Sequence, residues 1–188
     1  MSPFHNLRLA AYGVILADPP WKFRTWGPKG NGRACPYQTM DLDAIKALPV
    51  RSLAAKDCLL VIWTTAPFLA VSIDVMKAWG AQFSTAGAWA KTLSDGSPAI
   101  GTGYRWRSSA EFWIAGTYGH PPRAKGLAIP NCITAMRREH SRKPGRLHED
   151  LETMFPDVPR CELFARQRRE GWDCWGNEVD YFDRMAAE

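Results

Sequence analysis

Short apolar runs alternate with helical stretches along most of the 188-residue chain. Residues 14–17 and 58–63 are continuous apolar runs of strand length, which is typical of buried strands. Residues 82–90, 111–115 and 162–165 have a similar character and predict three further strands. These runs divide the chain into strand-sized units separated by polar connections.

Three segments between or after these strands have helical spacing. The first is predicted over 41–48, from a capping Asp41 to the residue before Pro49. The second begins at Pro67, and the third begins at Pro144. The inward faces are expected at Leu69, Ile73 and Met76 in the second helix, which Gly80 ends, and at Leu147, Leu151, Met154 and Phe155 in the third. The alternation predicts one α/β domain over residues 1–188, with a mostly parallel sheet and helices on both faces.

The tetrapeptide Asp18-Pro19-Pro20-Trp21 directly follows the first predicted strand. Its acid therefore stands at the carboxyl end of a parallel strand, where open α/β sheets bind ligands. The two prolines fix the backbone and remove two N–H donors, so the segment presents hydrogen-bond acceptors. A proline-rich turn with a packing tryptophan is the alternative explanation.

The chemistry of these four residues suits a planar ring with an exocyclic amino group. The carboxylate and a fixed carbonyl would accept from its two amine protons, and the Trp21 ring would stack on the base. Such an amine is a weak nucleophile, because its lone pair is delocalised into the ring. Acceptors on both protons stabilise the charge that develops in the transition state. We therefore expect Asp18, Pro19, Pro20 and Trp21 to be catalytic.

Composition adds a basic character that is concentrated in loops. The chain has 24 Lys and Arg against 19 Asp and Glu, a formal charge of +5. Three groups of basic residues lie outside the predicted strands: Lys22, Arg24, Lys29 and Arg33; Arg105 and Arg107; and Arg137, Arg138, Arg142, Lys143 and Arg146. Basic clusters beside a candidate site favour a polyanionic substrate such as nucleic acid.

Other features narrow the class of protein. Five cysteines without a C-x-x-C pair give no sign of a zinc site or a disulfide framework. The sequence has no 18-residue apolar segment and no signal-peptide pattern, so we expect a cytoplasmic location without membrane attachment. It does not predict an oligomeric state.

The segment Ala17-Asp18-Pro19-Pro20-Trp21 resembles the signature of the MT-A70 family of S-adenosylmethionine-dependent N6-adenine methyltransferases. Further stretches agree with that family in the same order: Tyr37, Trp89-Ala90-Lys91-Thr92, His140-Ser141-Arg142-Lys143-Pro144, Glu162-Leu163-Phe164-Ala165-Arg166 and Gly171-Trp172-Asp173-Cys174-Trp175-Gly176-Asn177-Glu178. The resemblance covers residues 12 to 180 and is closest to compact bacterial and prophage members. It implies a Rossmann-like methyltransferase fold, S-adenosylmethionine as methyl donor and no metal.

The same resemblance assigns donor-binding roles. Lys143 matches a lysine that contacts the methionine carboxylate, and Arg166 matches a position that holds the ribose. Asn177 matches an amide that binds the nucleoside, Glu178 replaces a glutamine at a ribose-binding position, and Asp18 would face the donor's amino group. 

Two positions depart from the larger members or align loosely with them. Eukaryotic-type members have Pro-His-Asn after the arginine, where this chain has Gln167-Arg168-Arg169; Gln167 is included among the expected donor contacts. Backbone near Phe4 to Leu7 is the expected source of adenine-ring contacts.

Two loops rich in Gly and Pro, at 22–40 and 93–107, are long enough to be functional. We expect the first to act as a lid in which Tyr37 touches the base, opposite Trp21. Lys22, Arg24 and Arg105 are expected on the substrate side.

DNA is favoured over RNA as substrate, because compact members resemble DNA modifiers and the chain has no RNA-binding module. Three alternatives stay open: N6-adenine methylation of RNA, N4-cytosine methylation of DNA, and an inactive nucleic-acid-binding partner subunit.

Overall fold

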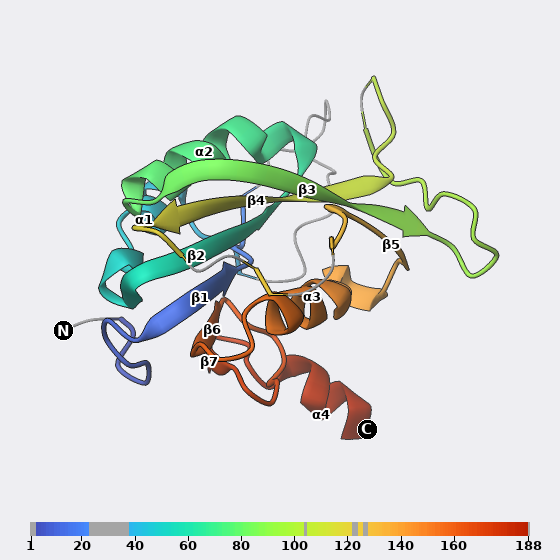
Figure 1. Ribbon diagram of the computed structural model, residues 1–188. Coiled ribbons are helices and arrows are strands. Elements are labelled where there is room, and N and C mark those ends of the chain that lie inside the picture. Colours follow the sequence, from blue (N-terminus) through green and yellow to red (C-terminus); the bar gives the residue numbers. More distant parts are fainter. Residues whose placement is uncertain (1–2, 23–37, 104, 122–123, 126–127, 188) are drawn as a thin grey trace.

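The computed structural model describes residues 3–22, 38–103, 105–121, 124–125 and 128–187. Its strands form a seven-stranded sheet in the order β5-β3-β4-β2-β1-β6-β7 (Figure 1). The strands are β1 (Tyr12–Ala17), β2 (Ala54–Thr64), β3 (Gln82–Thr92), β4 (Ala110–Tyr118), β5 (Cys132–Met136), β6 (Arg160–Leu163) and β7 (Asp173–Trp175). The helices are α1 (Leu42–Lys46), α2 (Leu69–Ala78), α3 (Arg146–Met154) and α4 (Tyr181–Ala187), with 3-10 turns at Val50–Ser52, Ala66–Phe68 and Glu139–Ser141.

The sheet is mostly parallel, as predicted. β1 pairs in parallel with β2 and β6, β6 with β7, and β3 with β5. Only β4 runs against its neighbours, β2 and β3. A loop without a crossover helix joins β3 to β4, which is the connection that antiparallel strands allow. The end of β3 and the start of β4 therefore lie at the same edge of the sheet as the end of β1.

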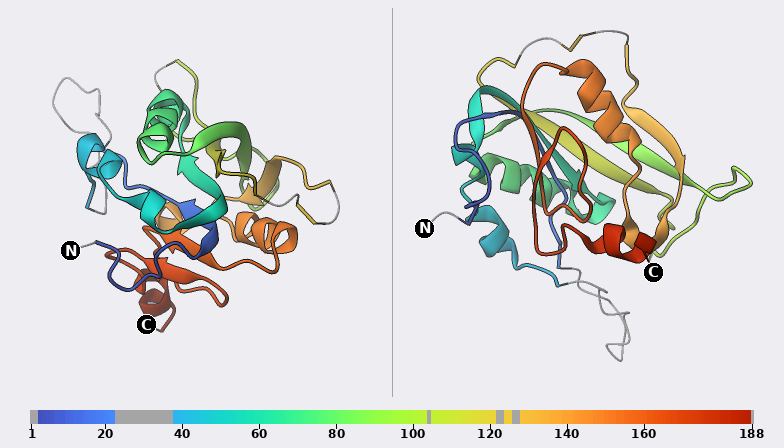
Figure 2. Two further views of the ribbon diagram at one scale, coloured as in Figure 1. Left: turned by 60° about the vertical axis from the view of Figure 1, so that its left-hand side comes forward. Right: turned by 90° about the horizontal axis from the view of Figure 1, so that it is seen from below.

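Successive side chains of β1 point to opposite faces and belong to two separate cores. Ile15 belongs to the buried cluster that contains Val75 of α2, whereas Leu16 belongs to the cluster that contains Leu151 of α3. Helices α2 and α3 accordingly cover opposite faces of the sheet (Figures 1 and 2). This arrangement confirms the predicted α/β fold of the Rossmann-like kind.

Several local predictions needed correction. The Asp41 side chain does not cap α1; it pairs with Lys22, whose Nζ lies 2.8 Å from Oδ1, and the helix is shorter than 41–48. Helix α2 buries Ser72, Val75 and Met76, while Leu69 and Ile73 are only partly buried. Leu147, Leu151 and Phe155 are buried as expected, although α3 begins two residues after Pro144.

The chain order reverses between β1 and β6, because β1 leads to β2 on one side and β6 leads to β7 on the other. Open α/β sheets bind ligands at such a point, outside the carboxyl ends of the strands. Asp18 follows β1 there, and its backbone N–H donates to the carbonyl of Leu163 at the end of β6, at 3.2 Å. Among the described helices, none is long and apolar enough to cross a membrane.

Candidate active site

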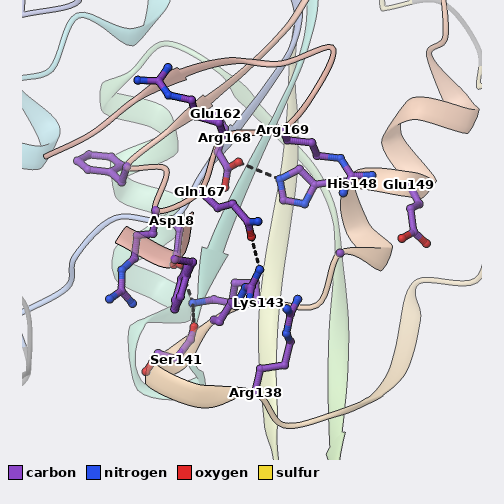
Figure 3. Close-up of a pocket in the computed structure, with 15 residues that line it drawn as sticks. Asp18, Arg138, Ser141, Lys143, His148, Glu149, Glu162, Gln167, Arg168 and Arg169 are labelled. Carbon is purple, nitrogen blue, oxygen red and sulfur yellow. Dashed lines mark hydrogen bonds and ion pairs between the residues drawn. The ribbon is translucent and has the colours of Figure 1, made fainter. Parts of the chain in front are cut away.

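Lys143 holds Asp18 in place. Its Nζ donates to Oδ2 of Asp18 at 2.7 Å and lies 3.4 Å from Oε2 of Glu111. The same ammonium lies 3.4 Å from the backbone carbonyl oxygen of Ser141, and Figure 3 shows Lys143 reaching between Asp18 and Ser141. One lysine therefore binds two carboxylates that come from the end of β1 and the start of β4.

Glu111 is a site residue that sequence reasoning missed. Lys91, near the end of β3, donates to Glu111 across the antiparallel β3–β4 pair, and its ammonium lies 4.8 Å from the centre of the Trp89 ring. The side chain of Glu111 is 12% exposed, against 25% for Asp18. Asp18 is therefore the more accessible of the two carboxylates. Lys91 lies within the stretch Trp89–Thr92 noted above, which was the available signal for this network.

The two carboxylates have pKa values displaced in opposite directions. Burial raises the pKa of Asp18 above its ordinary value, and the charge of Lys143 opposes that rise without cancelling it. Burial also acts to raise the pKa of Glu111, but the ammonium groups of Lys143 and Lys91 outweigh it, and that pKa is lowered. The two lysines therefore favour the ionised form of Glu111, whereas burial disfavours the ionised form of Asp18.

The proline carbonyls, which were expected to accept hydrogen bonds from a substrate, already accept hydrogen bonds within the protein. The carbonyl of Pro19 accepts from the Trp21 N–H at 2.8 Å, and that of Pro20 accepts from the Met40 N–H at 3.0 Å. These bonds fix the direction of both carbonyls. A carbonyl oxygen has two lone pairs, so each can still accept from a substrate.

Trp21 is buried, with 4% of its surface exposed. Its indole N–H donates to the carbonyl of Trp63 at 3.2 Å, and its ring packs against Phe68 with the centroids 5.6 Å apart. This geometry favours a packing role for Trp21 over the predicted stacking on a base. The ring anchors the turn that presents Asp18, Pro19 and Pro20.

A cavity of 630 Å³, the wide cavity, opens beside Asp18. Its lining includes the predicted residues Pro19, Pro20, Lys143, Arg166, Asn177 and Glu178. Phe164, Leu48 and Trp175 supply apolar walls. The fold thus gathers residues from the ends of β1, β6 and β7 around one space that carries both polar and apolar groups.

A second cavity of 400 Å³, the arginine cavity, adjoins the first and is drawn in Figure 3. Five residues line both cavities: Asp18, Ser141, Lys143, Phe164 and Arg166. The arginine cavity also includes Arg138, Arg142, Gln167, Arg168, Arg169 and Gly145, the residue before α3. Glu149 and Glu162 also line this cavity, but its arginines outnumber them and the N-terminus of α3 adjoins it, which together favour an anionic group.

The predicted ribose contacts Arg166 and Glu178 form a pair, with Nε of the arginine 2.8 Å from Oε2 of the glutamate. The Arg166 guanidinium also lies over the rings of Tyr181 and Phe182, at 4.4 and 4.8 Å from their centroids. Gln167 accepts from the guanidinium of Arg142. These contacts orient the wall shared by the two cavities before any ligand enters.

Backbone strain is concentrated at the same wall. Phe164 and Ser141 have φ values of 62° and 61°, in the left-handed region that non-glycine residues rarely adopt. Such strain persists where surrounding structure fixes it and is frequent at functional sites. Gly176 allows β7 to approach β6, since an added Cβ would lie 2.8 Å from the carbonyl oxygen of Ala165.

The N-terminal segment reaches the wide cavity at Pro3, the residue before the range Phe4 to Leu7 that was predicted to contact the adenine ring. Pro3 lines the cavity, and its carbonyl accepts from the indole N–H of Trp175 at 2.9 Å. The Phe4 ring packs edge-on against the same Trp175, at 4.9 Å between centroids.

Some predicted substrate residues lie elsewhere. Tyr37 and Arg24 fall outside the described residues. Lys22 makes the ion pair with Asp41, and Arg105 is exposed on the β3–β4 loop, outside both cavities.

Comparison with protein families identifies the chain. The model of the MT-A70 family matches residues 12–178. The chain belongs to the MT-A70 family. This match spans β1 to Glu178 and includes Asp18, Glu111 and Lys143, so the whole lysine-linked network lies within the MT-A70 region.

Three curated relatives show the breadth of similarity. The "Type II methyltransferase M.MunI" of a Mycoplasma species is 31% identical over 195 residues, which cover 94% of this chain and 81% of that protein. The "N(6)-adenosine-methyltransferase MT-A70-like" of Arabidopsis thaliana is 31% identical over 92% of this chain but only 24% of its own length. Human "N(6)-adenine-specific methyltransferase METTL4" is 28% identical over 98% of this chain and 41% of that protein.

Proposed function

We propose that this chain transfers a methyl group from S-adenosylmethionine to the N6 amine of adenine in nucleic acid, with DNA favoured over RNA. The observation that carries the proposal is Asp18, followed by two prolines, at the carboxyl end of strand β1 and open to the wide cavity. The names of the MT-A70 relatives, which specify N6-adenine or adenosine methylation, support it.

The residues around the two cavities fit S-adenosylmethionine in size and chemistry. Asn177 and the Arg166–Glu178 pair offer hydrogen bonds to nucleoside and ribose, beside the apolar Trp175. Lys143, Gln167 and the arginine cavity suit the carboxylate of the methionine part. When bound, the donor supplies an electrophilic methyl group on a positively charged sulfur.

The protein's own groups act on the acceptor amine. The carboxylate of Asp18 accepts a hydrogen bond from the amine and stabilises the positive charge that would develop on nitrogen as the N–C bond forms and the bond between the methyl carbon and sulfur breaks, with its electron pair left on sulfur. The amine loses one proton in the product, and Asp18 is placed to accept it. Pro19 and Pro20 hold their carbonyls in fixed directions, while Lys143 orients the carboxylate. Orientation of two bound reactants supplies much of the remaining acceleration.

The acceptor strand approaches from the loops at the same edge of the sheet. In a duplex the target adenine has to leave the base stack to reach Asp18. Tyr37 is proposed to contact that base, and Lys22, Arg24 and Arg105 are proposed to contact phosphates. Binding should therefore weaken with salt, with a slope of about −0.9 per neutralised phosphate on duplex DNA.

DNA is favoured as substrate because the chain covers most of one relative, a type II methyltransferase, and only a small part of the adenosine methyltransferases. The chain covers 81% of the type II methyltransferase M.MunI, but only 24% of the Arabidopsis adenosine methyltransferase.

The deciding experiment follows labelled methyl groups from S-adenosylmethionine into matched DNA and RNA oligonucleotides at one salt concentration. The expected result is label in DNA that disappears when adenine is replaced by inosine. Label in RNA alone would overturn the choice of DNA. Label that persists without adenine would point to cytosine, and absence of both donor binding and label would favour an inactive subunit.

A further inference from the structure

The loop between β3 and β4 carries an exposed tryptophan that the proposed chemistry does not use. Trp106 is 91% exposed, whereas Trp63, Trp79 and Trp89 are almost completely buried. Exposing a large aromatic ring to water costs hydrophobic free energy, so a fully exposed tryptophan is a candidate contact for a partner. Its neighbours in the sequence, Arg105 and Arg107, are exposed as well.

The segment that carries Trp106 projects from the sheet, and its described residues, 98–103 and 105–109, are here named the finger. Its first residues fold back on β3: Pro98 bridges Thr92, and the N–H of Ala99 donates to the carbonyl of Lys91 at 2.8 Å. Ala99 is 2% exposed and anchors this base. Figure 1 shows the connection between β3 and β4 projecting beyond the sheet.

Backbone hydrogen bonds also close the finger near its tip. The N–H of Gly101 donates to the carbonyl of Ser108 at 2.6 Å, and the N–H of Ser108 donates to the carbonyl of Thr102 at 3.0 Å. Gly103 has no room for a side chain, because an added Cβ would lie 1.9 Å from the Trp106 carbonyl oxygen. Trp106 therefore lies close to Gly103 at the tip of the finger.

The base of the finger is linked directly to the active site. Lys91 and Glu111 stand on either side of the finger, and Glu111 shares Lys143 with Asp18. Three strand spacings separate β3 from β1 in the sheet, which amounts to roughly 14 Å at about 4.8 Å each. A base or base pair next to a target bound at Asp18 lies within reach of such a projection.

We propose that the finger engages the nucleic-acid acceptor, with Trp106 stacking on a base near the target while Arg105 and Arg107 contact the adjacent phosphates. This inference rests on the proposed function of the Asp18 site. Residues 96–110 contain no Asp or Glu, so the finger presents positive charge around one aromatic ring. Aromatic rings between cationic side chains bind unpaired or unstacked bases with little dependence on sequence.

A second copy of this chain is a less suitable occupant. The chain carries a formal charge of +5, and a symmetric contact through the finger would bring Arg105 and Arg107 of both copies together. Nucleic acid supplies the complementary charge and a flat apolar surface at once.

The test compares Trp106→Ala and Trp106→Phe with Leu9→Ala, which removes a 62% exposed side chain before β1, at the opposite edge of the sheet. Binding of a fluorescent DNA oligonucleotide is measured at several salt concentrations, without methyl transfer. We expect Trp106→Ala to weaken binding about 10-fold with an unchanged salt slope, and Trp106→Phe to restore most of it. Arg105→Ala should instead lower the salt slope by about one, and Leu9→Ala should change neither quantity.

The outcomes separate the finger from the proposed function. Unchanged oligonucleotide binding and methyl transfer in Trp106→Ala would overturn the proposed role of the finger in nucleic-acid binding, while leaving the methyltransferase proposal intact. If Trp106→Ala loses oligonucleotide binding and the unmodified chain methylates no adenine, the proposed role of the finger is supported. The proposed methyltransferase function is then overturned. A change in sedimentation without a change in oligonucleotide affinity would assign Trp106 to a protein interface and overturn the proposal.

Discussion

Asp18 and Glu111 share the ammonium group of Lys143, but they stand in different surroundings. Glu111 receives a second ammonium from Lys91 and is 12% exposed. Asp18 forms an ion pair with Lys143, is 25% exposed and lines both cavities. The first carboxylate is fixed on two sides, whereas the second faces the space where ligands would bind.

The difference explains how a buried ionic network can serve a reaction. An ionised carboxylate has about four acceptor positions, and Lys143 uses one oxygen of Asp18. The remaining capacity is available to an amine in the wide cavity. Burial raises the pKa of Asp18, whereas the two lysines lower the pKa of Glu111 and favour its ionised form. The pair thus combines a carboxylate fixed by two ammonium groups with a carboxylate that faces the cavities and can exchange a proton.

The largest effect is expected from Asp18→Asn, which keeps the shape and removes the charge. Turnover should fall by about 10²- to 10³-fold, because one group that stabilises the transition state is lost. The fold should persist, since Lys143 still has Glu111 and the Ser141 carbonyl within 3.4 Å. Single-turnover methyl transfer and denaturant unfolding measure the two properties. Near-native turnover in this variant would place the reaction elsewhere.

Lys143→Met should have the next largest effect, on donor binding and on pH dependence. Donor affinity should weaken by about 1–3 kcal/mol, the cost of leaving a polar partner unsatisfied. The positive charge of Lys143 lowers the pKa of Asp18, so its removal should raise that pKa. Because the reaction needs ionised Asp18, the acidic limb of the kcat/KM profile should move to higher pH.

Lys91→Met is the matched control, because Lys91 contacts Glu111 and not Asp18. Its acidic limb should stay close to that of the unmodified chain. Equal displacement of the limb in both variants would show that Asp18 does not control it.

The sequence predicted those parts of the fold that local pattern determines. The apolar run before Asp18 is β1, and the inward positions Leu147 and Leu151 of α3 are buried. Strand β5 escaped prediction because Ile133 is its one fully buried residue, at the edge of the sheet. Strand β7 is three residues long and has no usable periodicity. The direction of β4 depends on tertiary pairing, which no local pattern encodes.

The candidate site likewise contains residues that the sequence predicted and residues that it did not. Asp18, Lys143, Arg166 and Asn177 were predicted from motifs, and the fold brings them to one pair of cavities. Glu111 was not predicted, because its role depends on the register between β3 and β4 and on a lysine 32 residues later in the chain. Trp21 looked like a ligand-binding residue in sequence, but only the structure reveals its burial.

Asn177→Ala tests the donor side of the wide cavity without altering either carboxylate. Affinity for S-adenosylmethionine should fall by about 1–2 kcal/mol, because hydrogen bonds to the nucleoside are lost. Oligonucleotide binding and the acidic limb should not change, since Asn177 lies two residues after β7 on the wall of the wide cavity and carries no charge. Titration calorimetry and a pH profile measure these quantities. Weaker oligonucleotide binding with unchanged donor affinity would assign Asn177 to the acceptor side.

Glu111→Gln should have the smallest effect on turnover and an opposite effect on pH dependence. The negative charge of Glu111 raises the pKa of Asp18, so the substitution should lower that pKa and move the acidic limb to lower pH. Turnover at neutral pH should change by no more than about 10-fold, because Asp18 stays ionised and keeps Lys143.

The stability of Glu111→Gln gives a second measurement. The lowered pKa of Glu111 means that its charge stabilises the fold above its ordinary pKa, and that this contribution disappears as pH falls through the lowered value. Denaturant unfolding should therefore show a deficit for Glu111→Gln at neutral pH that closes under acidic conditions. A limb that moves to higher pH, as in Lys143→Met, would mean that Glu111 acts on catalysis by positioning Lys143 and not through its charge on Asp18.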